Sequence, residues 1–112
     1  MNQKTIFNSL KRLVKSIGAE LFFDNAFHGI GGMLMCYKKN IWIVINKKLS
    51  LAKQNFVIAH ELAHFTLEHT GYSTEQLFYS EKTKKKKIYS AIEDEADSLA
   101  YEIIQSVSGQ LN

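Results

Sequence analysis

The stretch SLAKQNFVIAHELAHFTLEH, residues 50–69, carries the strongest pattern in this sequence. At about 100° per residue, its apolar side chains cover most of the circumference of a helix. We therefore predict a buried helix with Ser50 as its N-cap and Gly71 just past its end. Its polar side chains fall into one wedge, which contains His60, Glu61, His64 and Glu68. Such a wedge on a buried helix must be paired, bound to a metal or turned towards a cleft.

Within this helix, residues 60–64 have the pattern HExxH. Two histidines four positions apart lie about 6 Å apart along a helix, so their imidazoles can converge on one ion. We predict that His60 and His64 bind Zn²⁺, which lowers the pKa of its bound water towards about 7 and polarises a scissile carbonyl. Glu61 lies about 100° around the helix from His60 and would act as the general base. The alternative is two hydrogen-bonded core histidines beside a surface glutamate.

A catalytic zinc commonly takes three protein ligands and leaves the fourth position to water. The third ligand has to come from elsewhere in the chain, and the candidates are Glu93, Glu95, His69 and His28. A metzincin arrangement does not fit, because Leu67 and Thr70 stand where that motif has glycine and histidine. His69 would also point to the opposite side of the helix.

The last predicted helix, residues 88–107, offers a pair of carboxylates. Glu93 and Asp97 are four positions apart and border its apolar face together, whereas Glu95 lies at the far border. We therefore expect Glu93 to be the third zinc ligand and Asp97 to accept the second N–H of a ligand histidine. The alternative for the pair is an ordinary solvated helix edge. A donor for the developing oxyanion stays open among several residues, namely Tyr72, Tyr79, Tyr89, Tyr101 and His28.

The rest of the chain predicts an α+β fold in a single domain, residues 1–112. A first amphipathic helix begins at about Asn2 and ends near Gly18, and three apolar segments then read AELFF, GMLMCY and IWIVIN. They predict a short, three-stranded, mostly antiparallel sheet with a tight turn at 38–40. We expect the helices to pack on this sheet, with a zincin-like active-site helix.

The 112 residues are 46% hydrophobic and 22% charged, which is typical of one compact domain. The single cysteine, Cys36, excludes an internal disulfide, and we expect it to be a buried small hydrophobe in a reducing compartment. No signal peptide or membrane span is recognisable, so we predict a cytoplasmic protein. The net charge of +3 becomes −2 without the five lysines at 82 and 84–87. We therefore expect no membrane partner and no direct nucleic-acid partner.

Two segments resemble the ImmA/IrrE family of metallopeptidases. The first is IWIVINKKLSLAKQNFVIAHELAHFTLEH, and the second, IEDEADSLAYEII, resembles the family's downstream E-x-x-A-D/N motif, with Leu99 in place of a usual aromatic residue. The resemblance implies zinc dependence, Glu93 as the third ligand and Asp97 as its acidic partner residue. It also implies site-specific cleavage of a helix-turn-helix repressor that controls a mobile element or a stress response.

Two other classes of function stay open. One is a catalytically silent, zinc-stabilised binding protein, such as a regulator or a toxin component. The other is a nucleic-acid-binding protein that uses the lysine run, which would bind in a strongly salt-dependent way. The presence of Glu61 favours the peptidase over the silent protein, because a binding module has no need of a general base.

Overall fold

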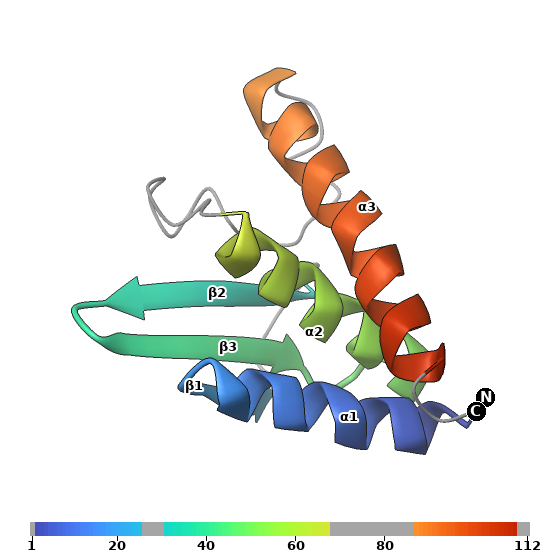
Figure 1. Cartoon of the computed structure of the whole chain (residues 1–112). Coiled ribbons are helices and arrows are strands. Elements are labelled where there is room, and N and C mark those ends of the chain that lie inside the picture. Colours follow the sequence, from blue (N-terminus) through green and yellow to red (C-terminus); the bar gives the residue numbers. More distant parts are fainter. Residues whose placement is uncertain (1, 26–30, 68–86, 110–112) are drawn as a thin grey trace.

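The computed structural model describes residues 2–25, 31–67 and 87–109. The elements follow in the order α1 (Gln3–Ser16), β1 (Ala19–Asp24), β2 (Gly32–Tyr37), β3 (Asn40–Asn46), α2 (Leu51–Thr66) and α3 (Lys87–Gly109). Helices α1 and α2 contact the sheet, and α3 packs chiefly along α2 (Figure 1). The predicted α+β class, with helices packed on a three-stranded sheet, is therefore confirmed.

The sheet is mixed and has the strand order β1-β3-β2. Strands β2 and β3 form an antiparallel hairpin in which Tyr37 pairs with Asn40, so the predicted turn lies at Lys38 and Lys39. Lys38 has a φ of 56°, the left-handed conformation that such tight turns require. Strand β1 pairs with β3 in parallel, with Ala19 opposite Ile41, which differs from the mostly antiparallel pairing expected from the sequence. Strand β3 lies between β1 and β2. The alternation of apolar residues along a strand does not specify whether its neighbour runs parallel or antiparallel to it.

The core lies between the sheet and the helices. The buried side chains that fill it are contributed by every element, namely Ile6, Leu10, Val14, Ala19, Leu34, Ile43, Ile45, Val57, Ile58, Ala59, Leu62, Ala100 and Val107. Strand β2 comes so close to α2 that a Cβ atom on Gly32 would lie 2.6 Å from Val57 Cγ1. Because Gly32 has no side chain, α2 can lie directly against the sheet at this point. The position of α2 in turn fixes the position of His60 and His64.

The ends of two helices follow the sequence signals. Ser50 Oγ accepts a hydrogen bond from Lys53 N at 3.3 Å and caps α2, while Gly18, with a φ of 78°, follows α1. Helix α2 ends at Thr66, and Gly71 lies outside the described residues. In the part of the chain that the structure describes, we find no helix with the length and apolarity needed to cross a bilayer.

The expectation for Cys36 was wrong, because its side chain is exposed. Cys36 lies near the end of β2, which is an edge strand, and the following residue Tyr37 is also exposed. The apolar run around Cys36 does not reveal that the last residues of this strand extend beyond the helices. The thiol is partly desolvated at this position, and this burial raises its pKa.

Candidate metal centre

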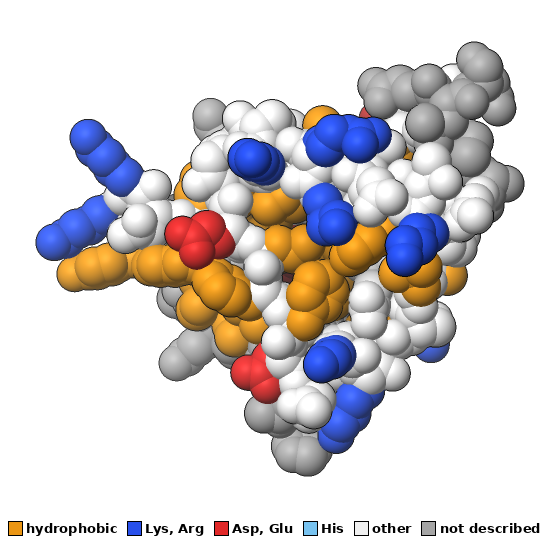
Figure 2. All heavy atoms as spheres, turned by 90° about the horizontal axis from the view of Figure 1, so that it is seen from below, with side chains coloured by type: hydrophobic (Ala, Val, Ile, Leu, Met, Phe, Trp, Pro, Cys, Tyr) orange, Lys and Arg blue, Asp and Glu red, His pale blue; other side chains and the backbone are white. Residues whose placement is uncertain are grey.

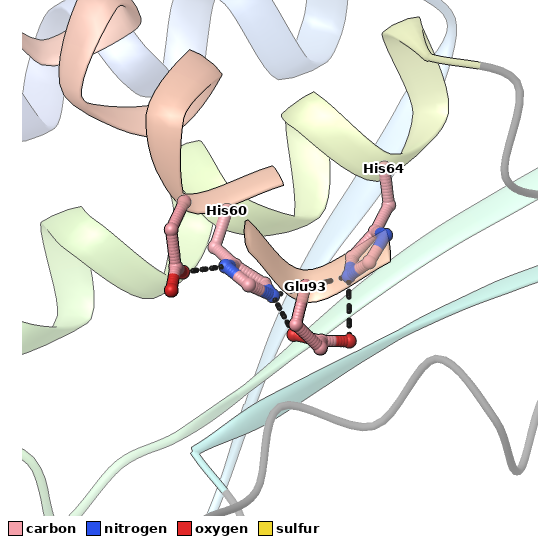
Figure 3. Close-up of polar contacts among 4 residues, drawn as sticks. His60, His64 and Glu93 are labelled. Carbon is pink, nitrogen blue, oxygen red and sulfur yellow. Dashed lines mark hydrogen bonds and ion pairs between the residues drawn. The ribbon is translucent and has the colours of Figure 1, made fainter. Parts of the chain in front are cut away.

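Helices α2 and α3 bring three potential ligands together at their crossing (Figure 3). His60 and His64 are on the same side of α2, one turn apart, and Glu93 extends towards them from α3. His60 Nε2 lies 2.7 Å from Glu93 Oε2, and His64 Nε2 lies 3.2 Å from Glu93 Oε1. The two Nε2 atoms are 3.0 Å apart. All three side chains are buried, so the two histidines and the carboxylate face one another away from water.

Asp97 lies on the other side of the His60 ring. Its Oδ1 is 2.8 Å from His60 Nδ1, and its side chain is 24% exposed. A carboxylate accepts this hydrogen bond, so Nδ1 carries a proton and Nε2 is the nitrogen turned towards His64 and Glu93. Asp97 thus lies within hydrogen-bond distance of His60 Nδ1, where a carboxylate can fix the tautomer and orientation of the ring.

The donor set fits a zinc ion in type and in spacing. Imidazole nitrogens and a carboxylate oxygen are ordinary zinc ligands, and in a tetrahedral site they lie about 3.3 Å from one another. One donor atom from each of His60, His64 and Glu93 can be chosen so that all three lie within 4.8 Å of one another. Over the described ranges, no other group of three His, Cys, Asp or Glu side chains meets this criterion.

Electrostatics hold the metal-free cluster together. Burial lowers the pKa of His60, but hydrogen bonds with Asp97 and Glu93, together with the nearby carboxylate charges, raise it to about 9. Burial raises the pKa of Glu93, yet its hydrogen bonds with His60 and His64 and their charges lower it to about 2. At neutral pH a protonated His60 therefore faces an ionised Glu93, and a buried positive charge is already accommodated where a cation would bind.

Glu61 is fully buried beside this cluster. Neither of its carboxylate oxygens has a hydrogen-bond partner among the described residues. Burial raises its pKa, the charge of His60 opposes this, and the charge of Glu93 adds to it, with the result that the pKa is about 8. A carboxyl group that titrates near neutral pH is suited to taking up and releasing a proton, and Glu61 is not among the three clustered donors.

Among the other candidates from the sequence, the structure describes the side chains of Glu95 and Tyr101. Glu95 is exposed on α3, and His28 and His69 lie outside the described residues. Among the tyrosines, Tyr72 and Tyr79 and the side chain of Tyr89 also lie outside them. Tyr101 is 62% exposed and packs on Phe56, with 5.1 Å between the ring centroids.

Phe56 lies beside His60 at the site, although it was not identified as a site residue from the sequence. Its ring centroid lies 6.2 Å from that of His60 and 5.1 Å from that of Tyr101. Phe56 is four residues before His60, so the two side chains are on the same helix face, and that spacing is the signal that could have indicated it. It forms an apolar wall beside the imidazole that Asp97 orients.

The profile described as the IrrE N-terminal-like domain matches residues 18–104. This range contains the sheet, α2 and the part of α3 that holds Glu93 and Asp97. No curated protein and no solved structure matches the chain significantly. The family profile covers most of the 112 residues, including all the clustered side chains. The chain therefore belongs to the IrrE N-terminal-like domain family, a family of zinc metallopeptidases.

Proposed function

We propose that this protein is a zinc metalloendopeptidase that hydrolyses a peptide bond in a partner protein. His60, His64 and Glu93 would hold the zinc, Glu61 would act as general base, and Asp97 would position His60. The observation that carries this proposal is the convergence of two buried imidazole Nε2 atoms from α2 with the Glu93 carboxylate from α3. Membership of a metallopeptidase family supports it independently.

Zinc in a site with three protein ligands lowers the pKa of water and polarises a carbonyl. Glu61 takes the proton from the attacking water and passes it to the leaving amine. In the metal-free protein burial raises the pKa of Glu61 to about 8, and a cation bound beside it would favour the ionised form that a general base needs. Asp97 keeps His60 Nδ1 protonated and its Nε2 turned towards the other two ligands, so the ring is oriented before substrate binds.

For the substrate, we infer a helix-turn-helix transcriptional repressor of a mobile element or stress regulon, cleaved at one site in the cytoplasm. Family membership supports a protein substrate. The alternative is a catalytically silent, zinc-stabilised regulator or toxin component. Glu61 favours the peptidase, because a buried carboxyl group without a hydrogen-bond partner among the described residues destabilises a fold. A protein that only bound zinc would gain stability by losing it.

Incubation of the zinc-loaded protein with candidate repressors tests the proposal. We expect the native chain to cut its repressor at one bond, while Glu61→Gln retains zinc and does not cut. The matched control is Glu95→Gln, an equal change at an exposed glutamate on α3, which should cut like the native chain. Undiminished cleavage by Glu61→Gln would remove Glu61 from the mechanism.

The ligand set is tested separately by zinc affinity. We expect Glu93→Ala to lose zinc affinity strongly and Glu95→Ala to retain it, because only Glu93 lies against the two histidines. The measurement is competition with a chromophoric chelator, with circular dichroism to show that both variants are folded. Equal retention by both variants would mean that the third ligand lies elsewhere.

A further inference from the structure

The exposed charges are segregated by sign between two parts of the molecule. The described residues up to 67 include nine Lys and Arg, against two exposed acidic side chains, Glu20 and Asp24. Residues 91–109 of α3 include no Lys or Arg, and their exposed or half-buried acidic side chains are Asp94, Glu95, Asp97 and Glu102. Among the residues that the structure describes, the exposed charges therefore form a basic part and an acidic part.

Seven exposed cations form what we call the basic face, namely Lys4, Lys11, Arg12, Lys15, Lys47, Lys48 and Lys53. The first four are on α1, and the others surround the start of α2. Hydrogen bonds join these segments: Asn55 Nδ2 donates to Gln3 O at 2.9 Å, and Gln54 Nε2 donates to Lys47 O at 3.2 Å. Figure 2 shows Lys and Arg side chains spread over the side of the molecule that α1 forms, with few acidic ones.

The basic face cannot be a lipid-binding amphipathic helix. The apolar side of α1 is already used in the core, where Ile6, Leu10 and Val14 are buried. A surface helix inserts its apolar side into lipid, and on α1 only one large apolar side chain is exposed, that of Leu13. Protein interfaces commonly concentrate their binding energy in well-packed pockets near the centre of the contact. The apolar hollow at Met33, Trp42 and Val44 is also lined by Phe23, and no Lys or Arg lines it.

We propose that the basic face binds the phosphodiester backbone of a nucleic acid. Helix α1, with 14 residues, is about 21 Å long, and a duplex presents on the order of a dozen phosphates over that length. Lys4, Lys11 and Lys15 are spaced along this helix, so several phosphates can be neutralised together. The half of α3 that carries Asp94, Glu95 and Asp97 projects away from α1 (Figure 1), so these carboxylates do not lie beside the same polyanion.

Aromatic rings accompany these cations. Lys11 Nζ lies 4.8 Å from the centroid of the Phe7 ring, and Phe7 packs on Phe23 at 5.9 Å. Phe23 is 38% exposed at the edge strand β1. Sites for single-stranded nucleic acid combine cations with rings on which bases stack. This binding is separate from the proposed peptidase activity, since none of these residues belongs to the metal cluster.

Fluorescence anisotropy with a labelled duplex of about 20 base pairs, and with one of its single strands, tests this proposal on the full chain. We expect a Kd of about 10⁻⁴ to 10⁻⁶ M at physiological salt, tightening steeply at about 50 mM salt. Lys11→Gln/Lys15→Gln should weaken binding about tenfold at low salt and reduce the salt slope by between about 1 and 2. Lys11→Arg/Lys15→Arg should bind like the native chain.

The matched control is Lys38→Gln/Lys39→Gln, which removes the same charge at the β2–β3 turn and should weaken binding by no more than about threefold. Three results would overturn the proposal. One is equal loss in both double variants, and another is loss only when the lysines at 84–87 are replaced by glutamine. The third is equal binding of polyglutamate at the same salt concentration. Retained nucleic-acid binding by Glu61→Gln keeps this test distinct from that of the peptidase.

Discussion

Asp97 on α3 holds His60 on α2 through a 2.8 Å hydrogen bond to Nδ1, while Nε2 of the same ring faces Glu93 at 2.7 Å. The two carboxylates from one helix therefore contact the two nitrogens of one imidazole. Helix α3 thus supplies both a potential metal ligand and the group that orients another. Relative movement of α2 and α3 would disturb both contacts, so the docking of these helices determines the geometry of the site.

Removing the carboxylate of Asp97 should weaken zinc binding. We expect Asp97→Ala to lower zinc affinity about 10- to 100-fold, because His60 loses the acceptor that sets its tautomer. Asp97→Asn should lose less, since an amide oxygen can still accept from Nδ1. Chelator competition measures both, with Asp94→Asn on the exposed side of α3 as control. Unchanged affinity in Asp97→Ala would show that the hydrogen bond does not support the metal.

Zinc binding should release protons at pH 7. In the metal-free protein the pKa of His60 is about 9, so the ring is protonated at pH 7 and must lose a proton to bind zinc. Glu93, with a pKa of about 2, is already ionised. Zinc affinity should therefore rise with pH until about 9. Calorimetry in two buffers of different ionisation enthalpy counts the released protons. In Glu61→Gln the residue at position 61 has no proton to release, so the count reports on His60. A count of zero in that variant would contradict the prediction.

Glu61 should destabilise the metal-free fold increasingly as the pH rises. Folding raises its pKa from 4.5 to about 8, so its contribution to stability is fully present below 4.5 and is lost as the pH rises through about 8. Glu61→Gln removes this titration. The free energy of unfolding of the variant minus that of the native chain should therefore increase between about pH 5 and pH 8. The increase should be at most about 1.4 kcal/mol per pH unit. Urea denaturation with a metal chelator measures this, and a difference that does not change with pH would refute it.

Gly32 should tolerate no side chain. A Cβ atom there would lie 2.6 Å from Val57 Cγ1 and 2.8 Å from the backbone oxygen of Val44, and the backbone atom cannot move aside cheaply. We expect Gly32→Ala to lower the free energy of unfolding by about 1–3 kcal/mol. Gly109→Ala is the control, because a Cβ atom there meets nothing within 4 Å. Thermal unfolding compares the two, and equal stability would mean that β2 and α2 separate easily.

Relations within one element were predictable from the sequence. The spacing of His60 and His64 places both on one side of α2, because a helix has a fixed period, and the capping of α2 by Ser50 follows from local hydrogen bonding. The same reasoning placed Glu93 and Asp97 on one side of α3. From the sequence we chose Glu93 rather than Glu95, and Glu93 is on the side of α3 that packs on α2, whereas Glu95 is exposed.

Relations between elements were decided by tertiary packing. Parallel pairing of β1 with β3 depends on where the hairpin docks, and the exposure of Cys36 depends on how far β2 extends beyond the helices. The crossing of α2 and α3 sets the 2.7 Å approach of Glu93 to His60, and burial between them shifts the pKa of Glu61. The net charge did not predict the basic face, because it does not say where on the molecule each charge lies. Local periodicity thus determined which residues share a surface, and three-dimensional packing determined which surfaces meet.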